Sequence, residues 1–96
     1  MTKEKITKRF DIQDYLKTKE EIIEYLKVSM EEDTPEEFVR SLANVIRSEG
    51  YAKIAKDIGV SREGLYKSFS GKTKPRFETI YKTINSLGLR MSLVAK

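Results

Sequence analysis

The side chains best suited to chemistry gather in one short segment of the second half of this sequence. Ser61, Arg62, Glu63, Tyr66 and Lys67 together supply hydrogen-bond donors, acceptors and an aromatic ring. Such groups can pair with base edges and with phosphate oxygens, and a serine that caps a helix can also donate to a phosphate. The segment therefore favours recognition of a nucleic acid over catalysis.

Other chemistries lack their usual residues. The 96-residue chain contains no cysteine and no histidine. A disulfide framework and a thiolate metal site are therefore excluded, and the commonest general base and metal ligand are absent. The acidic residues lie mainly near helix ends and on polar faces rather than in pairs, so we expect no catalytic residue, no cofactor and no metal site.

A second group of basic residues follows directly. Lys72, Lys74 and Arg76 lie in a segment whose Ser, Gly, Thr and Pro content predicts a loop. From Arg62 to Arg76 there are five basic residues and one acidic residue, a local charge of +4. Such a loop can bind the sugar-phosphate backbone of DNA and raise affinity rather than sequence preference. A loop that is simply solvated is the alternative.

Two short helices are needed to position these groups. The pattern predicts one helix over Tyr51–Ile58 and a second from the cap Ser61 to about Phe69. Ala55 is small enough for two helices to cross closely, and Gly59 tolerates the positive φ that a tight turn requires. The residues expected to face inward are Ile54, Ile58, Val60, Leu65 and Phe69. This combination predicts a helix-turn-helix, with an ordinary helical hairpin as the alternative.

Single residues of the second helix also allow other interpretations. Arg62 and Lys67 could be ordinary surface charges, and Glu63 with Lys67 could form a surface ion pair. Tyr66 could contact a thymine methyl group or a phosphate, or be a half-buried packing residue. Gly64 costs about 1 kcal/mol relative to alanine in a helix, and it would allow close approach either to DNA or to the preceding helix.

The whole chain is predicted to be one all-α domain of five to six helices with a short C-terminal β-strand. We expect residues 1–10 to be flexible, 11–50 to form N-terminal helices, 51–87 the helix-turn-helix core and 89–95 the strand. Two capping boxes, Thr18 with Glu21 and Thr34 with Glu37, begin helices in the first half, and Asp11 could cap a short turn. The strand is predicted from the alternation of apolar residues in the tail.

Charge divides the sequence into two unlike halves. Residues 1–50 carry a net charge of −3, and residues 51–96 carry +7. The basic half suits phosphates, whereas the acidic half is compatible either with a basic partner or with helix-terminus residues alone. No apolar run approaches the roughly 20 residues that cross a bilayer, and no signal peptide is evident, so the chain is expected to be cytoplasmic.

With these residues identified, a resemblance can be stated. Residues 51–87 resemble the lambda-repressor-like (Xre) helix-turn-helix class, including the Ser70-Gly71 and Pro75 positions. Residues 10 to 94 resemble the addiction-module antidote (antitoxin) proteins. The matching stretches are Phe10-Asp11, Tyr15-Leu16, Thr18–Met30, Pro35–Phe38, Ala52–Gly59, Val60–Glu63, Leu65–Lys67, Ser70-Gly71, Pro75 and Leu87–Arg90. Gly64 and the basic run Lys72-Thr73-Lys74 depart from the usual pattern.

The resemblance implies a DNA-binding antitoxin of a type II toxin–antitoxin module. Such a protein neutralises a small basic toxin of the RelE/ParE type and represses its own operon through operator DNA. The alternatives are a stand-alone or phage-type transcriptional regulator without a toxin, and an interaction module that has lost DNA binding. We also expect a homodimer, in which the 89–95 strand pairs with its two-fold mate or instead adds to the sheet of a toxin.

Overall fold

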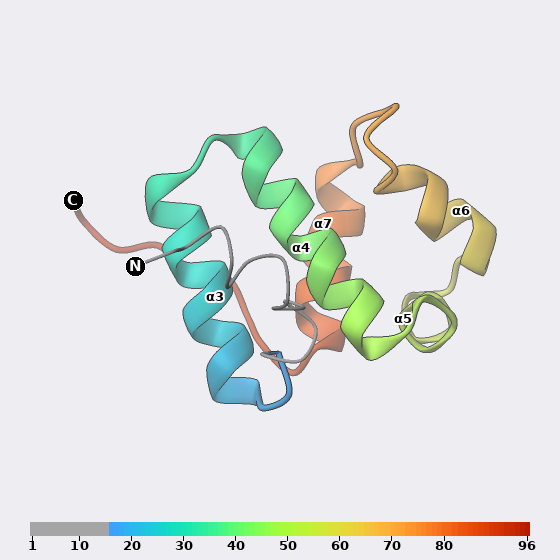
Figure 1. Ribbon diagram of the computed structural model, residues 1–96, viewed down its shortest axis with the longest axis horizontal. Coiled ribbons are helices and arrows are strands. Elements are labelled where there is room, and N and C mark those ends of the chain that lie inside the picture. The colour runs from blue at the N-terminus through green and yellow to red at the C-terminus, as the bar shows by residue number, and fades with distance from the viewer. Residues whose placement is uncertain (1–15) are drawn as a thin grey trace, which may run out of the picture. The chain divides into compact units, whose positions relative to one another are not determined.

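The computed structural model describes residues 16–96, which form helices and no strand within that range (Figure 1). The chain divides into two compact units, one up to Ser48 and one from Glu49 onward. The helices are α3 (Lys19–Glu32), α4 (Pro35–Glu49), α5 (Tyr51–Ile58), α6 (Arg62–Ser68) and α7 (Phe77–Ser86). The all-helical class is therefore confirmed. The predicted flexible start at 1–10 and the turn capped by Asp11 lie outside the described residues.

Helix α3 begins at the first predicted capping box. The Thr18 hydroxyl accepts a hydrogen bond from the Glu21 amide at 3.1 Å, and the Glu21 carboxylate accepts from the Thr18 amide at 3.0 Å. The same carboxylate accepts from the Lys17 amide at 3.0 Å. These backbone bonds, from Lys17 and then Thr18, lower the pKa of Glu21 below its usual value. The local pattern thus fixes where the helix starts.

Helix α4 begins in the same way, with Pro35 as its first residue. The Thr34 hydroxyl accepts from the Glu37 amide at 3.2 Å, and the Glu37 carboxylate accepts from the Thr34 amide at 2.9 Å. The bond from the Thr34 backbone lowers the pKa of Glu37. Because both glutamates have lowered pKa values, their stabilising effect is present above the ordinary carboxyl pKa and is lost as the pH falls through the lowered values.

The two helices of the first unit are joined by polar contacts as well as by apolar packing. The buried hydroxyls of Ser29 and Ser41 lie 2.9 Å apart, and the Asn44 amide donates to the Tyr25 hydroxyl at 2.9 Å. Figure 1 shows α3 and α4 running side by side after the turn at Asp33. The fully buried side chains on α4 are Leu42, Val45 and Ile46.

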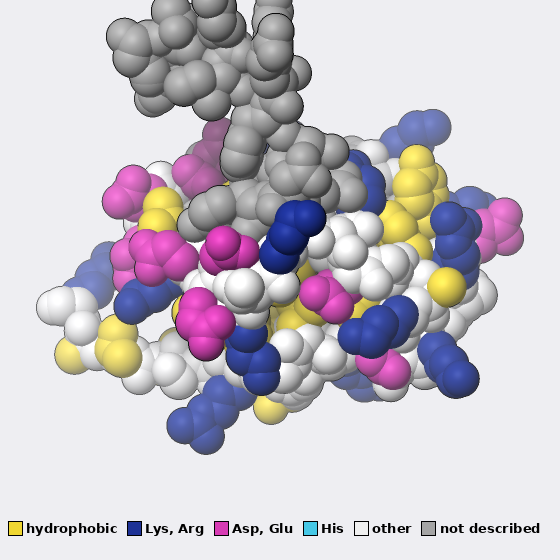
Figure 2. Space-filling view, turned by 60° about the horizontal axis from the view of Figure 1, so that its bottom comes forward, with side chains coloured by type: hydrophobic (Ala, Val, Ile, Leu, Met, Phe, Trp, Pro, Cys, Tyr) yellow, Lys and Arg dark blue, Asp and Glu magenta, His cyan; other side chains and the backbone are white. Residues whose placement is uncertain are grey.

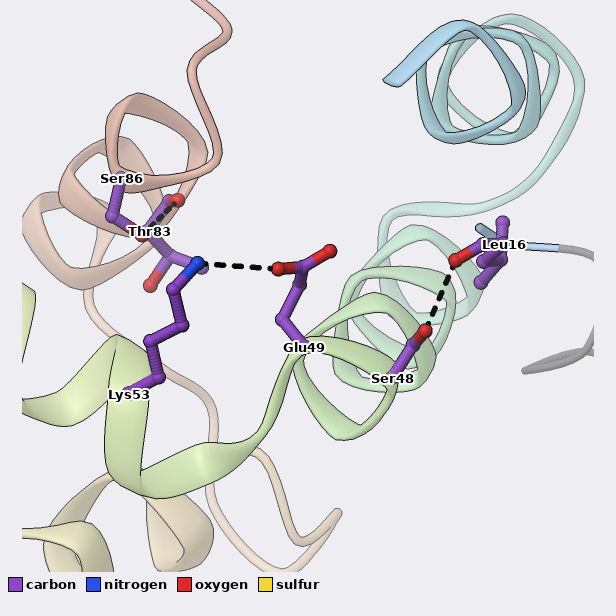
Figure 3. A network of polar contacts seen from close by, with 6 residues as sticks. All are labelled: Leu16, Ser48, Glu49, Lys53, Thr83 and Ser86. Carbon is purple, nitrogen blue, oxygen red and sulfur yellow. Dashed lines mark hydrogen bonds and ion pairs between the residues drawn. The ribbon is translucent and has the colours of Figure 1, made fainter. Parts of the chain in front are cut away.

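The segment before α3 is tied to the end of α4. The Ser48 hydroxyl donates to the Leu16 carbonyl at 3.1 Å (Figure 3). The Leu16 side chain is itself only 1% exposed. Leu16 therefore closes the apolar interior of the first unit, where the sequence indicated only a short turn.

The predicted strand at 89–95 was wrong. The Gly88 amide donates to the Asn85 carbonyl at 3.0 Å, and the Leu89 amide donates to the Ile84 carbonyl at 3.3 Å. This pair of bonds is the Schellman motif that ends α7, so the backbone of the first predicted strand residue already serves the helix. A strand also needs a second strand as a partner, and no strand is found among residues 16–96.

Candidate nucleic-acid interface

The second unit is built around α5, which packs against both α6 and α7. Ile54 and Ala55 of α5 are 0% and 2% exposed, and Leu65 and Phe69 from the α6 segment are also buried. A residue as small as alanine at the inner face of α5 lets the neighbouring helix come close. The inward positions predicted for Ile54, Leu65 and Phe69 are therefore confirmed, and Ala55 is buried where the close helix crossing was predicted. Ile58, which was also predicted to face inward, is half-buried.

The turn between α5 and α6 depends on Gly59. Its φ of 81° and ψ of 31° are left-handed, as the sequence predicted. The Gly59 and Val60 amides both donate to the Ala55 carbonyl, at 2.9 Å and 3.0 Å. This sharp reversal ends α5 and leaves the Val60 side chain 44% exposed. The inward placement predicted for Val60 was wrong because the turn, rather than a helical period, sets its direction.

Ser61 is the N-cap of α6, as predicted. Its hydroxyl oxygen accepts from the Gly64 amide at 2.9 Å, and its carbonyl accepts from the Leu65 amide at 3.0 Å. A Cβ atom on residue 64 would lie 2.9 Å from that same hydroxyl oxygen. Gly64 thus leaves room for the cap of its own helix, a reason that differs from the two suggested by the sequence.

This geometry predicts coupling between residues 61 and 64. In the natural chain Gly64→Ala should gain up to about 1 kcal/mol of helix propensity but displace a cap worth about 0.5–2 kcal/mol. We expect no net stabilisation there, whereas in a Ser61→Ala background the same change should stabilise by about 1 kcal/mol. Urea unfolding of the four proteins measures the difference. Equal effects of Gly64→Ala in both backgrounds would contradict the prediction.

The outward face of α6 carries the predicted site residues. Arg62, Glu63, Tyr66 and Lys67 are all exposed. Because residues four apart share a helix face, Arg62 lies in line with Tyr66, and Glu63 lies in line with Lys67. No ion pair joins Glu63 to Lys67 in the described part of the chain, so neither charge is neutralised by the other.

One of these residues has an aromatic neighbour that the sequence analysis missed. The rings of Tyr66 and Tyr51 lie 5.4 Å apart between centroids, with an interplanar angle of 68°. Tyr51 is the first residue of α5 and is half-buried, whereas Tyr66 remains 54% exposed. An aromatic residue at the start of the first helix, opposite one on the second, was the signal that could have identified this pair.

The basic loop is held against the end of α6. The Ser70 amide and hydroxyl both donate to the Lys67 carbonyl, at 3.2 Å and 2.9 Å. Three exposed basic residues then follow, and the last of them occupies the N-cap position of α7; they are Lys72, Lys74 and Arg76. The structure thus places the loop in direct continuation of α6, as the proposed grouping requires.

Charge differs between the two units in the way that the sequence suggested. Residues 49–96 contain ten Lys and Arg against four Asp and Glu, and residues 16–48 contain five against eight. The basic set includes exposed Lys53 and Lys56 on α5, which the sequence analysis did not single out. Lys53 also forms an ion pair with Glu49 at 3.4 Å (Figure 3). In Figure 2 acidic side chains gather on the side where Figure 1 places α3.

Residues 16–96 offer neither a metal site nor a membrane span. No cluster of three or more Asp and Glu residues could hold a metal ion in this range. None of the helices described is long and apolar enough to cross a membrane.

Comparison with known proteins decides the family. A family model described as "Probable addiction module antidote protein" matches residues 6–95. The chain belongs to this family. The antidote family is a class of regulatory and binding proteins rather than enzymes, so the resemblance to the antidote proteins and the non-enzymatic prediction are both confirmed.

One curated relative extends the comparison. An "Uncharacterized protein" from Haemophilus influenzae is 38% identical over 86 residues, which cover 90% of this chain and 89% of the relative. No solved structure gave a significant match. Membership of the antidote family therefore rests on sequence, and the lambda-repressor-like class remains a prediction.

Proposed function

We propose that this antidote-family protein is the antitoxin of a type II toxin–antitoxin module and binds operator DNA through α5 and α6. The observation that carries the proposal is the tight α5–Gly59–α6 turn, which presents an exposed polar helix face beside a basic loop. Lambda-repressor-like proteins use such a pair of helices to place the second one in the major groove. Bound in this way at its own operator, the protein would repress its operon in the cytoplasm.

The exposed groups divide by the part of DNA that each can contact. Arg62 and Lys67 have donors that fit the acceptors of a guanine edge, and Glu63 has an acceptor for the cytosine amino group. Lys72, Lys74 and Arg76 lie beyond the helix and suit the phosphate backbone. The Ser61 hydroxyl accepts the cap bond with its oxygen, which leaves its hydrogen to donate to a phosphate.

Substitutions should separate these two kinds of contact. On a duplex from the region upstream of its own gene, Arg62→Ala and Lys67→Ala should change sequence preference, by about 1–3 kcal/mol for each base contact. Lys72→Ala and Lys74→Ala should weaken binding to every duplex and lower the salt slope by about one unit each. Fluorescence anisotropy at two salt concentrations measures both effects.

A control and an oligomeric expectation belong to the same experiment. Lys27→Ala, an exposed lysine on α3, should leave affinity and salt slope unchanged. We propose that a homodimer binds, because one short helix contacts too few base pairs to discriminate well. Two chains per duplex are therefore expected from titration. Unchanged affinity in all four test variants would remove DNA binding from this surface.

We further propose that the first unit binds a small basic toxin of the RelE/ParE type. The acids of this unit differ in what they contact. Glu21 and Glu37 are used in capping boxes, whereas Glu24 and Glu31 are exposed on α3 outside either cap. Glu24 and Glu31 therefore offer charge to a basic partner that no capping bond uses.

Copurification tests this part of the proposal. Co-expressed with the product of the adjacent open reading frame, the tagged protein should retain that product at low salt. The double change Glu24→Lys, Glu31→Lys should reverse the local charge and release the partner, whereas Lys72→Ala should retain it. Failure of the natural chain to retain a partner, with DNA binding intact, would indicate a stand-alone regulator.

A further inference from the structure

We infer that Tyr66 recognises the 5-methyl group of a thymine, and that Tyr51 is a positioning residue that holds the Tyr66 ring for this contact. The inference rests on the proposed DNA binding of α6 and names one chemical feature that this helix would recognise. It follows from the tyrosine pair, which decides between the alternatives that the sequence left open for Tyr66.

Tyr66 is contacted by one neighbouring ring and keeps much of its own ring exposed. One side of its ring is engaged by Tyr51 in an edge-to-face contact, with centroids 5.4 Å apart and planes inclined by 68°. The side chain is nevertheless 54% exposed. A tyrosine that served packing alone would lie mostly in the interior, as Leu65 and Phe69 of the same segment do. Tyr66 is therefore restrained by its contact with Tyr51, while part of its side chain stays accessible to a partner.

The other residues on the exposed face of α6 differ from Tyr66 in chemistry. Arg62, Glu63 and Lys67 end in charged groups, and Gly64 has no side chain. Tyr66 is thus the member of this face with a large apolar surface. In the major groove the thymine methyl group is the apolar feature, and apolar side chains recognise it by contact. Arg62 lies one turn earlier on the same face of α6 and would reach a neighbouring base, such as a guanine.

Tyr51 restrains the position of the Tyr66 ring. An exposed aromatic side chain on an isolated helix samples several rotamers, and ordering one of them on binding reduces affinity. Tyr51 restricts this freedom because it lies at the first position of α5, whose next turn carries fully buried Ile54. Through this ring contact, Tyr51 therefore limits the rotamers that the exposed Tyr66 side chain can adopt.

The experiment removes the methyl group alone. A duplex is first selected with the natural protein from a random-sequence pool, and each thymine is then replaced singly by deoxyuridine, which keeps the base pair. At one or more positions this replacement should raise Kd about three- to tenfold for the natural protein. The same replacement should change nothing for Tyr66→Ala, and Tyr66→Phe should behave like the natural chain.

Tyr51 and Val60 provide the positioning test and the control. Tyr51→Ala should reduce the methyl discrimination, and Tyr51→Phe should preserve it, because the ring rather than the hydroxyl makes the contact. Val60→Ala should leave it unchanged, although Val60 is an exposed apolar residue beside α6. Circular dichroism melting confirms that each variant is folded before its binding is measured.

The outcomes distinguish this inference from the proposed function. If the natural protein selects no sequence and binds no duplex at low salt, DNA binding itself is wrong. If it binds a preferred duplex but no position responds to uridine, the thymine contact is wrong and DNA binding stands. If Tyr66→Ala still discriminates between thymine and uridine, the assignment of the contact to Tyr66 is wrong. If Val60→Ala loses this discrimination instead, the residue that contacts the methyl group lies in the turn.

Discussion

Ile54→Ala is expected to lower the free energy of unfolding by about 2–5 kcal/mol. Ile54 is 0% exposed, and its helix is the one that packs against both α6 and α7. The truncation removes buried apolar surface and leaves a cavity that the surrounding helices can fill only in part. Since small domains are stable by about 5–15 kcal/mol in total, the second unit should lose much of its stability.

Val60→Ala is the matched control for this change. Val60 lies six residues later and is 44% exposed, so its truncation should change stability by about 0.5 kcal/mol or less. Urea unfolding followed by circular dichroism, with hydrogen exchange of the α5–α7 amides, measures both variants. Equal losses for the two would show that Val60 is as buried as the sequence predicted and that the turn differs from the one described.

The contrast between these two residues shows where prediction from the sequence fails. Ile54 lies within a helix, where spacing alone tells which side chains share a face. Val60 lies beyond Gly59, whose left-handed conformation breaks that relation. Both residues are apolar, yet Ile54 is buried and Val60 is exposed, because helical spacing determines the direction of Ile54 only.

Features fixed by contacts over three or four residues were predicted correctly. Both threonine–glutamate capping boxes, the left-handed Gly59 and the Ser61 cap all depend on such short-range bonds. The tail shows the limit. Apolar alternation predicted a strand, but a strand is completed by a partner that the alternating segment cannot itself supply, and Leu93 is 99% exposed.

The polar side chains of the candidate site could be predicted from the sequence, but the contacts that hold them in place could not. The exposed side chains of α6 could be assigned because Leu65 marks the opposite face of the helix. The contact between Tyr51 and Tyr66 joins residues fifteen positions apart across a turn, so it required the packing of α5 on α6. The role of Gly64 could be recognised only from the position of the Ser61 hydroxyl oxygen, which the spacing of residues in the sequence does not give.

Thr83→Val is expected to raise the free energy of unfolding by about 1–3 kcal/mol. Thr83 is 0% exposed, and its hydroxyl oxygen has no hydrogen-bond partner among the described residues. Its backbone is by contrast well satisfied, because the carbonyl accepts from the Ser86 hydroxyl at 2.9 Å (Figure 3) and from the Leu87 amide at 3.2 Å. The unfavourable group is therefore the side-chain hydroxyl alone.

Valine removes that hydroxyl while nearly keeping the shape and the helix propensity of threonine. Two controls isolate the effect. Thr79→Val, at a half-buried position one turn earlier on α7, reports what the same change does in that helix outside the core. Thr83→Ser keeps the hydroxyl and deletes the methyl group, so it should instead lower stability by about 0.5–1.5 kcal/mol. A loss of stability in Thr83→Val, measured by urea unfolding, would mean that the hydroxyl makes a hydrogen bond in solution. A gain confined to Thr83→Val would show that α7 retains a buried polar group at the expense of its own stability.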